Sequence, residues 1–279
     1  MDFGLFGINM NFLADPEWSA KVAQHAEGLG FESLWTGEHV VLPDPREAPS
    51  PAEPETPMLH PPALLAYLAG VTENIKLATG ITLIAQRNPV VLAKEMGSLD
   101  VLCQGRLLFG VGAGYLHQEF DALGVDFATR GARTDEYIDA MRVLWNDAQP
   151  SFAGSFVNFD NIQAQPRPAQ IGGPPIIVGG NSPAAMRRAV THGNGWYGFA
   201  MDVQTTAKAL AQLELAKARH TRPHELGNLS VSITPPKPPN RAMVEEYANL
   251  GVDRLIPMTG FYNENNILAS LDGLAAEVM

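Results

Sequence analysis

The chain contains a single cysteine in 279 residues, Cys103, and therefore cannot form an internal disulfide. The disulfide framework typical of secreted proteins is excluded, and a reducing, cytoplasmic environment is expected. No apolar run approaches the roughly 18 residues that a membrane-spanning helix needs. Met1 is followed by a strand-like run rather than by a basic leader and a cleavage site. We therefore expect a soluble protein that does not interact with a membrane.

Basic residues are also scarce. Lys and Arg total 19 against 30 Asp and Glu, which gives a formal net charge of -11. A nucleic-acid surface needs clustered Lys and Arg to neutralise phosphates, so no nucleic-acid partner is expected. An anionic ligand would have to be bound locally, by backbone N–H groups and a few arginines.

Several catalytic signatures are missing. The seven histidines are scattered without a His-Glu-x-x-His run or a Cys-His cluster, so we expect no metal site. A serine nucleophile is not indicated, because no Gly-x-Ser-x-Gly elbow is present. The glycine run 110–114 does not open a dinucleotide-binding fold, because at least three strand signals precede it and residues 133–137 begin a helix. Its alternating glycines indicate a strand end whose backbone passes close to a bound ligand.

The sequence does contain a regular alternation of two patterns. Eight runs rich in β-forming residues predict strands at 3–8, 33–37, 76–83, 106–111, 175–178, 195–199, 229–233 and 254–258. Segments with helical periodicity separate them, and Asp15-Pro16, Asn88-Pro89 and Ser182-Pro183 each place an N-cap before a first-turn proline. Eight β-α units over this length predict one α/β domain, residues 1–279, folded as a (β/α)₈ TIM barrel with insertions.

Two stretches interrupt the alternation. Residues 43–62 hold eight prolines and follow the second strand, on the face where barrel active sites lie, so we predict that they form a lid loop. Residues 146–174 contain aromatic residues around a Gly154-Ser155 turn and are predicted to form an inserted hairpin.

The pair Glu38-His39 comes directly after the second strand. Imidazole titrates near neutrality, and an adjacent carboxylate would orient it, so His39 is a candidate proton donor or acceptor. The alternative is a histidine at the edge of the core that bonds to a loop carbonyl.

Two glycine-containing turns are candidate cofactor sites. Gly179 to Ser182 lie between the fifth strand and a helix, where free N–H groups and the helix dipole suit a phosphate, with Arg187 and Arg188 one turn further on. An ordinary left-handed turn with an N-cap is the alternative. At the end of the third strand, Gly80 would allow an unusual backbone conformation, such as a bulge or a cis peptide against a ring.

Taken together, these residues resemble the bacterial luciferase-like monooxygenase superfamily, specifically its coenzyme F420-dependent oxidoreductase branch. The resemblance covers essentially the whole chain. Its marks are Trp35 to His39, Thr79 to Ile81 with Arg87 to Pro89, Gly105 to Tyr115 with Glu119-Phe120 and Leu123-Gly124, the helix 133–145, Pro175 to Gly180, and Asn194 to Tyr197. The fold of that family is a (β/α)₈ barrel with insertions, in agreement with the strand pattern.

The resemblance implies roles for these positions. The Gly80-Ile81 peptide would be a non-prolyl cis bond that supports a deazaflavin ring, and the glycine run would line the edge of that ring. The implied cofactor-binding residues are Thr79, Gly80, Ile81, Gly112, Ala113, Gly114, Gly179, Gly180, Asn181 and Ser182. Relatives in the glucose-6-phosphate dehydrogenase branch have Asp in place of Glu38 and a carboxylate in place of Tyr115, so their substrate and general acid do not carry over.

The predicted function is transfer of a hydride between coenzyme F420 and an unidentified small organic substrate. His39 would exchange the proton with help from Glu38, and Tyr115 is the next candidate proton donor. Two alternatives stay open: an FMN-dependent monooxygenase that receives reduced flavin from a separate reductase, and a non-catalytic protein that binds flavin or deazaflavin. The resemblance also suggests a homodimer. The substrate and the direction of hydride transfer are not specified by the sequence.

Overall fold

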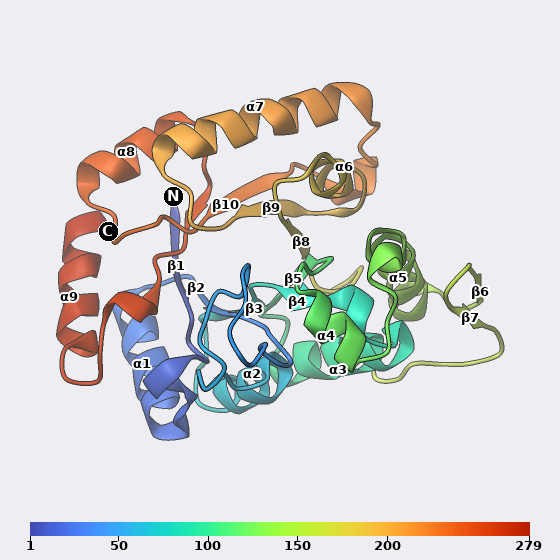
Figure 1. Ribbon diagram of the computed structural model, residues 1–279, viewed down its shortest axis with the longest axis horizontal. Coiled ribbons are helices and arrows are strands. Elements are labelled where there is room, and N and C mark those ends of the chain that lie inside the picture. The colour runs from blue at the N-terminus through green and yellow to red at the C-terminus, as the bar shows by residue number, and fades with distance from the viewer.

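The computed structural model describes all residues, 1–279, and shows a parallel β-barrel surrounded by helices (Figure 1). Its strands are β1 (Asp2–Phe6), β2 (Ser33–Thr36), β3 (Lys76–Thr79), β4 (Thr82–Leu83), β5 (Leu107–Gly112), β8 (Ile176–Gly179), β9 (Gly195–Gly198), β10 (Ser230–Ile233) and β11 (Arg254–Leu255). They follow the order β3-β2-β1-β11-β10-β9-β8-β5-β4, and pairing of β3 with β5 closes the barrel. The predicted TIM barrel is confirmed, with the third strand broken into β3 and β4.

The helices cover the outside of the barrel, and the three that follow Asp15, Asn88 and Ser182 begin at the predicted caps. They are α1 (Pro16–Leu29), α2 (Pro61–Ala69), α3 (Pro89–Leu102), α4 (His117–Ala122), α5 (Arg130–Asn146), α6 (Pro183–His192), α7 (Val203–Arg219), α8 (Arg241–Asn249) and α9 (Ile267–Val278). Short 3₁₀ turns lie at Asn11–Ala14, Ile84–Gln86, Phe127–Thr129, His224–Leu226 and Thr259–Phe261. Asp15, Asn88 and Ser182 each accept backbone N–H groups of the first helical turn that follows them. None of these helices is both long and apolar enough to span a bilayer.

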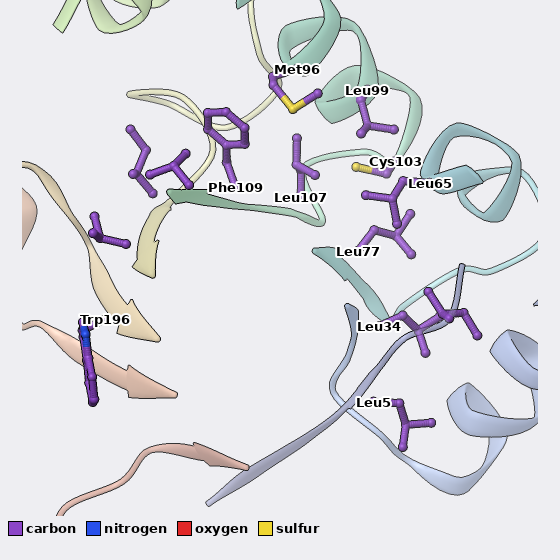
Figure 2. Packing of buried hydrophobic residues seen from close by; sticks show 14 of the residues in the cluster. Leu5, Leu34, Leu65, Leu77, Met96, Leu99, Cys103, Leu107, Phe109 and Trp196 are labelled. Atoms are coloured by element: carbon purple, nitrogen blue, oxygen red, sulfur yellow. The ribbon is translucent and has the colours of Figure 1, made fainter. Parts of the chain in front are cut away.

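Alternating side chains of the strands form two apolar layers. Figure 2 shows Leu77 and Leu107 pointing outward, towards Leu65 of α2 and towards Met96 and Leu99 of α3. The inner layer fills the barrel interior and consists of Phe6, Trp35, Ala78, Leu108, Ile177, Tyr197 and Ile256. Successive residues of a strand point to opposite faces, so strands such as β2, β3 and β5 contribute to both layers.

The segment 146–174 leaves the barrel wall and carries a short antiparallel pair, β6 (Phe152–Ala153) with β7 (Asn158–Phe159), far from the barrel axis in Figure 1. The Glu136 carboxylate of α5 accepts hydrogen bonds from the backbone N–H groups of Ser155, Phe156 and Val157. This carboxylate fixes the turn between the two strands.

The proline-rich segment has two different parts. Buried Asn9 donates its side-chain amide to the carbonyls of Gly37 and Leu59 and accepts the N–H of Gly37. The Asn11 N–H donates to the Pro57 carbonyl, and α2 begins at Pro61. Residues 57–59 are therefore attached to the segment after β1, residues 61–62 belong to α2, and the lid remains a prediction for residues 43–56 alone.

An ion cluster joins the amino ends of three strands. The Glu32 carboxylate accepts two hydrogen bonds from Arg254, of 2.7 and 2.8 Å, and one of 2.7 Å from Lys76. The remaining Arg254 nitrogen, Nη1, donates to Ser232 at 3.0 Å. Burial raises the pKa of Glu32, but the Arg254 guanidinium and the Lys76 ammonium outweigh that effect and lower the pKa to about 2.

We expect this cluster to make stability depend on pH. The pKa of Glu32 is about 2 in the folded chain and about 4.5 when it is unperturbed, so its contribution is complete above 4.5 and is lost as the pH falls through 2. Over that window the free energy of unfolding should fall by about 3 kcal/mol more in the native chain than in Glu32→Gln. Urea unfolding at several pH values measures the difference.

The matched control is Asp2→Asn, because the Asp2 carboxylate lies 3.6 Å from Arg254 but is 54% exposed. This variant should keep the pH dependence of the native chain. Parallel stability curves for Glu32→Gln and the native chain would show that the cluster does not titrate as described.

Candidate functional site

A cavity of about 400 Å³ opens at the carboxyl ends of the strands. Twelve of the thirteen residues predicted for the site line it: Glu38, His39, Gly80, Ile81, Gly112, Ala113, Gly114, Tyr115, Gly179, Gly180, Asn181 and Ser182. Thr79 is the exception, since its buried hydroxyl donates to the Gly110 carbonyl at 2.7 Å within the barrel wall. The strand ends therefore bring together residues that are up to 144 positions apart between Glu38 and Ser182.

The Ile81 side chain forms part of the cavity wall and occupies space left by glycines. The Gly80–Ile81 peptide bond is cis, as the family resemblance implies. A Cβ atom at Gly112 would lie 2.0 Å from Ile81 Cδ1, and one at Gly179 would lie 2.8 Å from the same atom. A Cβ at Gly110 would lie 1.9 Å from the Thr79 carbonyl oxygen. Close approach of protein atoms therefore already requires glycine at positions 110 and 112, and Gly112 in addition lines the cavity.

His39 contacts two ionisable groups. Its Nε2 lies 3.3 Å from the Tyr115 hydroxyl oxygen, at the cavity surface. On the other side of the ring, Nδ1 lies 3.2 Å from Glu119 Oε2, at ion-pair distance but without the angles of a hydrogen bond. The Glu119 carboxylate is fully buried and accepts the Val40 N–H at 2.9 Å. These contacts hold His39 between a buried carboxylate and a phenol that reaches the cavity.

Glu38, which is predicted to assist His39, makes no polar contact with it. Its Oε1 accepts the Leu83 N–H at 3.0 Å and lies 2.9 Å from Arg87 Nη2. Neighbouring side chains at a strand end point in different directions, so sequence adjacency did not produce contact. Burial raises the pKa of Glu38, although the Arg87 guanidinium opposes that shift.

The Tyr115 phenol can act as a hydrogen-bond donor. Burial raises the pKa of Tyr115, and the nearby Glu119 carboxylate raises it further. The hydroxyl is therefore protonated at neutral pH and can hydrogen-bond to an imidazole nitrogen that has lost its proton.

The turn before α6 provides hydrogen-bond donors at the far end of the cavity. The backbone N–H groups of Asn181 and Ser182 donate to no acceptor within the chain, and Gly180 has φ of 110°. Arg188 also lines the cavity and is held by Asp135 Oδ1 at 2.6 Å and by the Gly131 carbonyl at 3.0 Å. Free N–H groups at a helix start beside an arginine can bind a phosphate.

Sequence reasoning gave no role to Glu119. The residue belongs to the Glu119-Phe120 pair that marks the family resemblance, and it lies four positions after Tyr115. That spacing allows both side chains to reach His39 from one short stretch of chain. The closeness of Glu119 to Tyr115 in the sequence was the signal that could have identified Glu119.

The packing of Ile81 predicts a specific rescue. Gly112→Ala should lower the free energy of unfolding by about 1–3 kcal/mol, because the new methyl group collides with Ile81 Cδ1. Ile81→Val removes that atom, so the double variant should recover most of the loss. Urea unfolding of both single variants and the double variant measures the coupling.

Gly110→Ala is the matched control. Its methyl group would meet a backbone oxygen, which Ile81→Val cannot move. Rescue of Gly110→Ala, or additive losses for Gly112→Ala and Ile81→Val, would contradict this packing.

Comparison with known proteins agrees with this architecture. An F420-dependent hydroxymycolic acid dehydrogenase of Mycobacterium tuberculosis is 30% identical over 209 residues, which are 74% of this chain and 55% of that protein. The oxygenase component of a flavin-dependent trigonelline monooxygenase of Acinetobacter baylyi is 29% identical over 226 residues, 78% of this chain and 57% of that protein. This chain thus spans little more than half the length of either relative.

The same fold occurs in the crystal structure of the monooxygenase RslO1 from Streptomyces bottropensis. It superposes with a TM-score of 0.79 and 20% identity, over 99% of this chain and 98% of that one. The profile of the family described as luciferase-like monooxygenase matches residues 13–278. The chain therefore belongs to the luciferase-like monooxygenase family.

Proposed function

We propose that the protein is an oxidoreductase that transfers a hydride between coenzyme F420 and a small organic substrate. The observation that carries the proposal is the placement of His39 between buried Glu119 and the Tyr115 hydroxyl at the cavity wall. When a hydride is added to or removed from a carbon that bears oxygen, the charge on that oxygen is balanced by a proton. His39 exchanges this proton, and Tyr115 lies within reach to pass it on.

The cavity fits a phosphorylated ring cofactor. The unpartnered N–H groups of Asn181 and Ser182, next to Arg188, would hold the phosphate. Ile81, fitted between Gly112 and Gly179, would support the ring. When bound there, F420 supplies or accepts the hydride. Glu119, whose Oε2 lies 3.2 Å from His39 Nδ1, would hold the imidazole in place beside the substrate.

FMN carries a related ring and a phosphate, so the same residues would also fit it. A relative named as an F420-dependent dehydrogenase and one named as a flavin-dependent oxygenase component match this chain about equally well. We favour F420 because the His39 cluster provides the acid-base chemistry that a dehydrogenase requires. An FMN-dependent oxygenase would in addition need a reductase partner. A carrier that only binds the cofactor would not need the His39 cluster.

The direct test is a pair of titrations, with F420 and with FMN, followed by absorbance, together with His39→Ala. We expect F420 to bind at least about tenfold more tightly than FMN. His39→Ala should retain F420 affinity within a few fold but lower kcat by about 10²- to 10⁴-fold, because proton transfer contributes only in the transition state. Tighter binding of FMN would replace F420 in the proposal. Full turnover by the alanine variant would remove His39 from the mechanism.

The two buried glutamates give a second test. In Glu119→Gln the carboxylate beside His39 Nδ1 is lost, so kcat should fall by about tenfold while F420 affinity stays within a few fold. Glu38→Gln is the matched control, because Glu38 pairs with Arg87 and makes no polar contact with His39. Thermal unfolding of both variants separates slower turnover from a loss of folded protein. Equal losses of kcat in the two variants would contradict a direct role for Glu119.

A further inference from the structure

We infer that the cavity next to His39 accepts neutral, mainly apolar carbonyl compounds or the corresponding alcohols and discriminates against charged ones. This inference rests on the proposed function for the carbonyl group and on the cavity wall for the rest of the molecule. The wall residues are Phe6, Met10, Pro51, Met58, Tyr197 and Phe199.

The apolar wall begins at His39 itself. The Met58 sulfur accepts the backbone N–H of His39 at 3.3 Å, and Met58 pairs with Met10 through a β-bridge. Glycine at position 37 lets Met10 and Phe6 approach the strand end, since a Cβ there would lie 3.1 Å from the Met10 sulfur. A substrate whose oxygen faces His39 therefore has its remaining atoms against methionine and aromatic side chains.

Phe6, Tyr197 and Phe199 form the aromatic part of this wall. The rings of Phe6 and Phe199 pack edge to face, with centroids 4.9 Å apart, and Phe199 remains 46% exposed. The Tyr197 hydroxyl is occupied by Thr234 Oγ1 at 2.6 Å. Tyr197 thus offers its ring to the cavity but no free polar group, and an apolar or aromatic substrate gains most from these surfaces.

Apart from His39, which faces the substrate oxygen, the charged side chains that line the cavity are paired within the chain. The lining contains only one arginine, Arg188, whose guanidinium is paired with Asp135 beside the turn before α6. The lining carboxylate, Glu38, is paired with Arg87 through Oε1, and its Oε2 is buried without a hydrogen-bond partner. A carboxylate or phosphate that faces the apolar wall would lose hydration without gaining a partner. A cationic group would likewise find no exposed carboxylate on this wall.

Three probes of similar shape test the inference: acetophenone, the anion 4-acetylbenzoate and the cation 4-acetyl-N-methylpyridinium. Calorimetric titration of the full chain, with and without F420, should show acetophenone binding at least about tenfold more tightly than either charged probe. Equal or tighter binding of a charged probe overturns the inference, as does no binding of acetophenone up to its solubility limit.

Two substitutions at one position assign the binding to this wall. Phe199→Ala should weaken acetophenone binding about fivefold by removing apolar contact. Phe199→Arg should invert the preference in favour of 4-acetylbenzoate by supplying the missing cation. Phe261→Ala and Phe261→Arg are matched controls, because Phe261 is also 46% exposed but lies outside the cavity lining.

The outcomes also separate this inference from the proposed function, because F420 affinity is measured independently by absorbance. Acetophenone binding without F420 binding would leave the neutral cavity intact and refute the cofactor. F420 binding with a preference for a charged probe would support the cofactor and overturn the inference of a neutral cavity. An unchanged preference in Phe199→Arg would show that the probes bind away from this wall and would overturn the inference.

Discussion

The close packing of the broken third strand against β5 is the constraint on which the cavity depends. Thr79 bonds to Gly110, and Ile81 fills the space that Gly112 and Gly179 leave open. Larger side chains at these glycines would push β3 and β4 away from β5 and β8. The shape of the cavity wall therefore depends on three glycines, which have no side chains. The residues around His39 lie next to this wall.

The carboxylates at the two ends of the barrel, Glu32 and Glu119, are contacted by different kinds of groups. At the amino ends, Glu32 is matched by a guanidinium and an ammonium, so its charge is compensated by groups that do not titrate near neutrality. At the carboxyl ends, the Glu119 carboxylate contacts a backbone N–H, the Gln86 amide and the His39 imidazole. Only the second arrangement places an imidazole beside the carboxylate. Permanently charged partners suit a structural role, whereas an imidazole is a side chain that can exchange a proton.

The sequence predicted the architecture well because strand periodicity and helix caps are local signals. All eight strands were located, and the Asp15, Asn88 and Ser182 caps begin the predicted helices. Twelve of the thirteen predicted site residues line one cavity, because a parallel barrel gathers its strand ends.

Contacts between distant segments were harder to predict. Glu38 was chosen as the partner of His39 because it is adjacent in sequence, whereas the contact comes from Glu119, on a helix after the glycine run. The end of the lid was also misplaced. Proline content marks a segment without regular structure, but it does not reveal that Asn9 binds Leu59 to the barrel. Such contacts depend on how distant elements pack together, and local sequence patterns do not predict that packing.

Asn9 has a consequence for how this enzyme scaffold can diversify. One buried amide holds Gly37 and Leu59 together, so the chain between them leaves and re-enters the barrel at fixed points. Insertions or deletions in residues 43–56 would leave these two attachment points in place. Loop length and composition can thus vary over generations while the end of β2, just before His39, stays in register with β1.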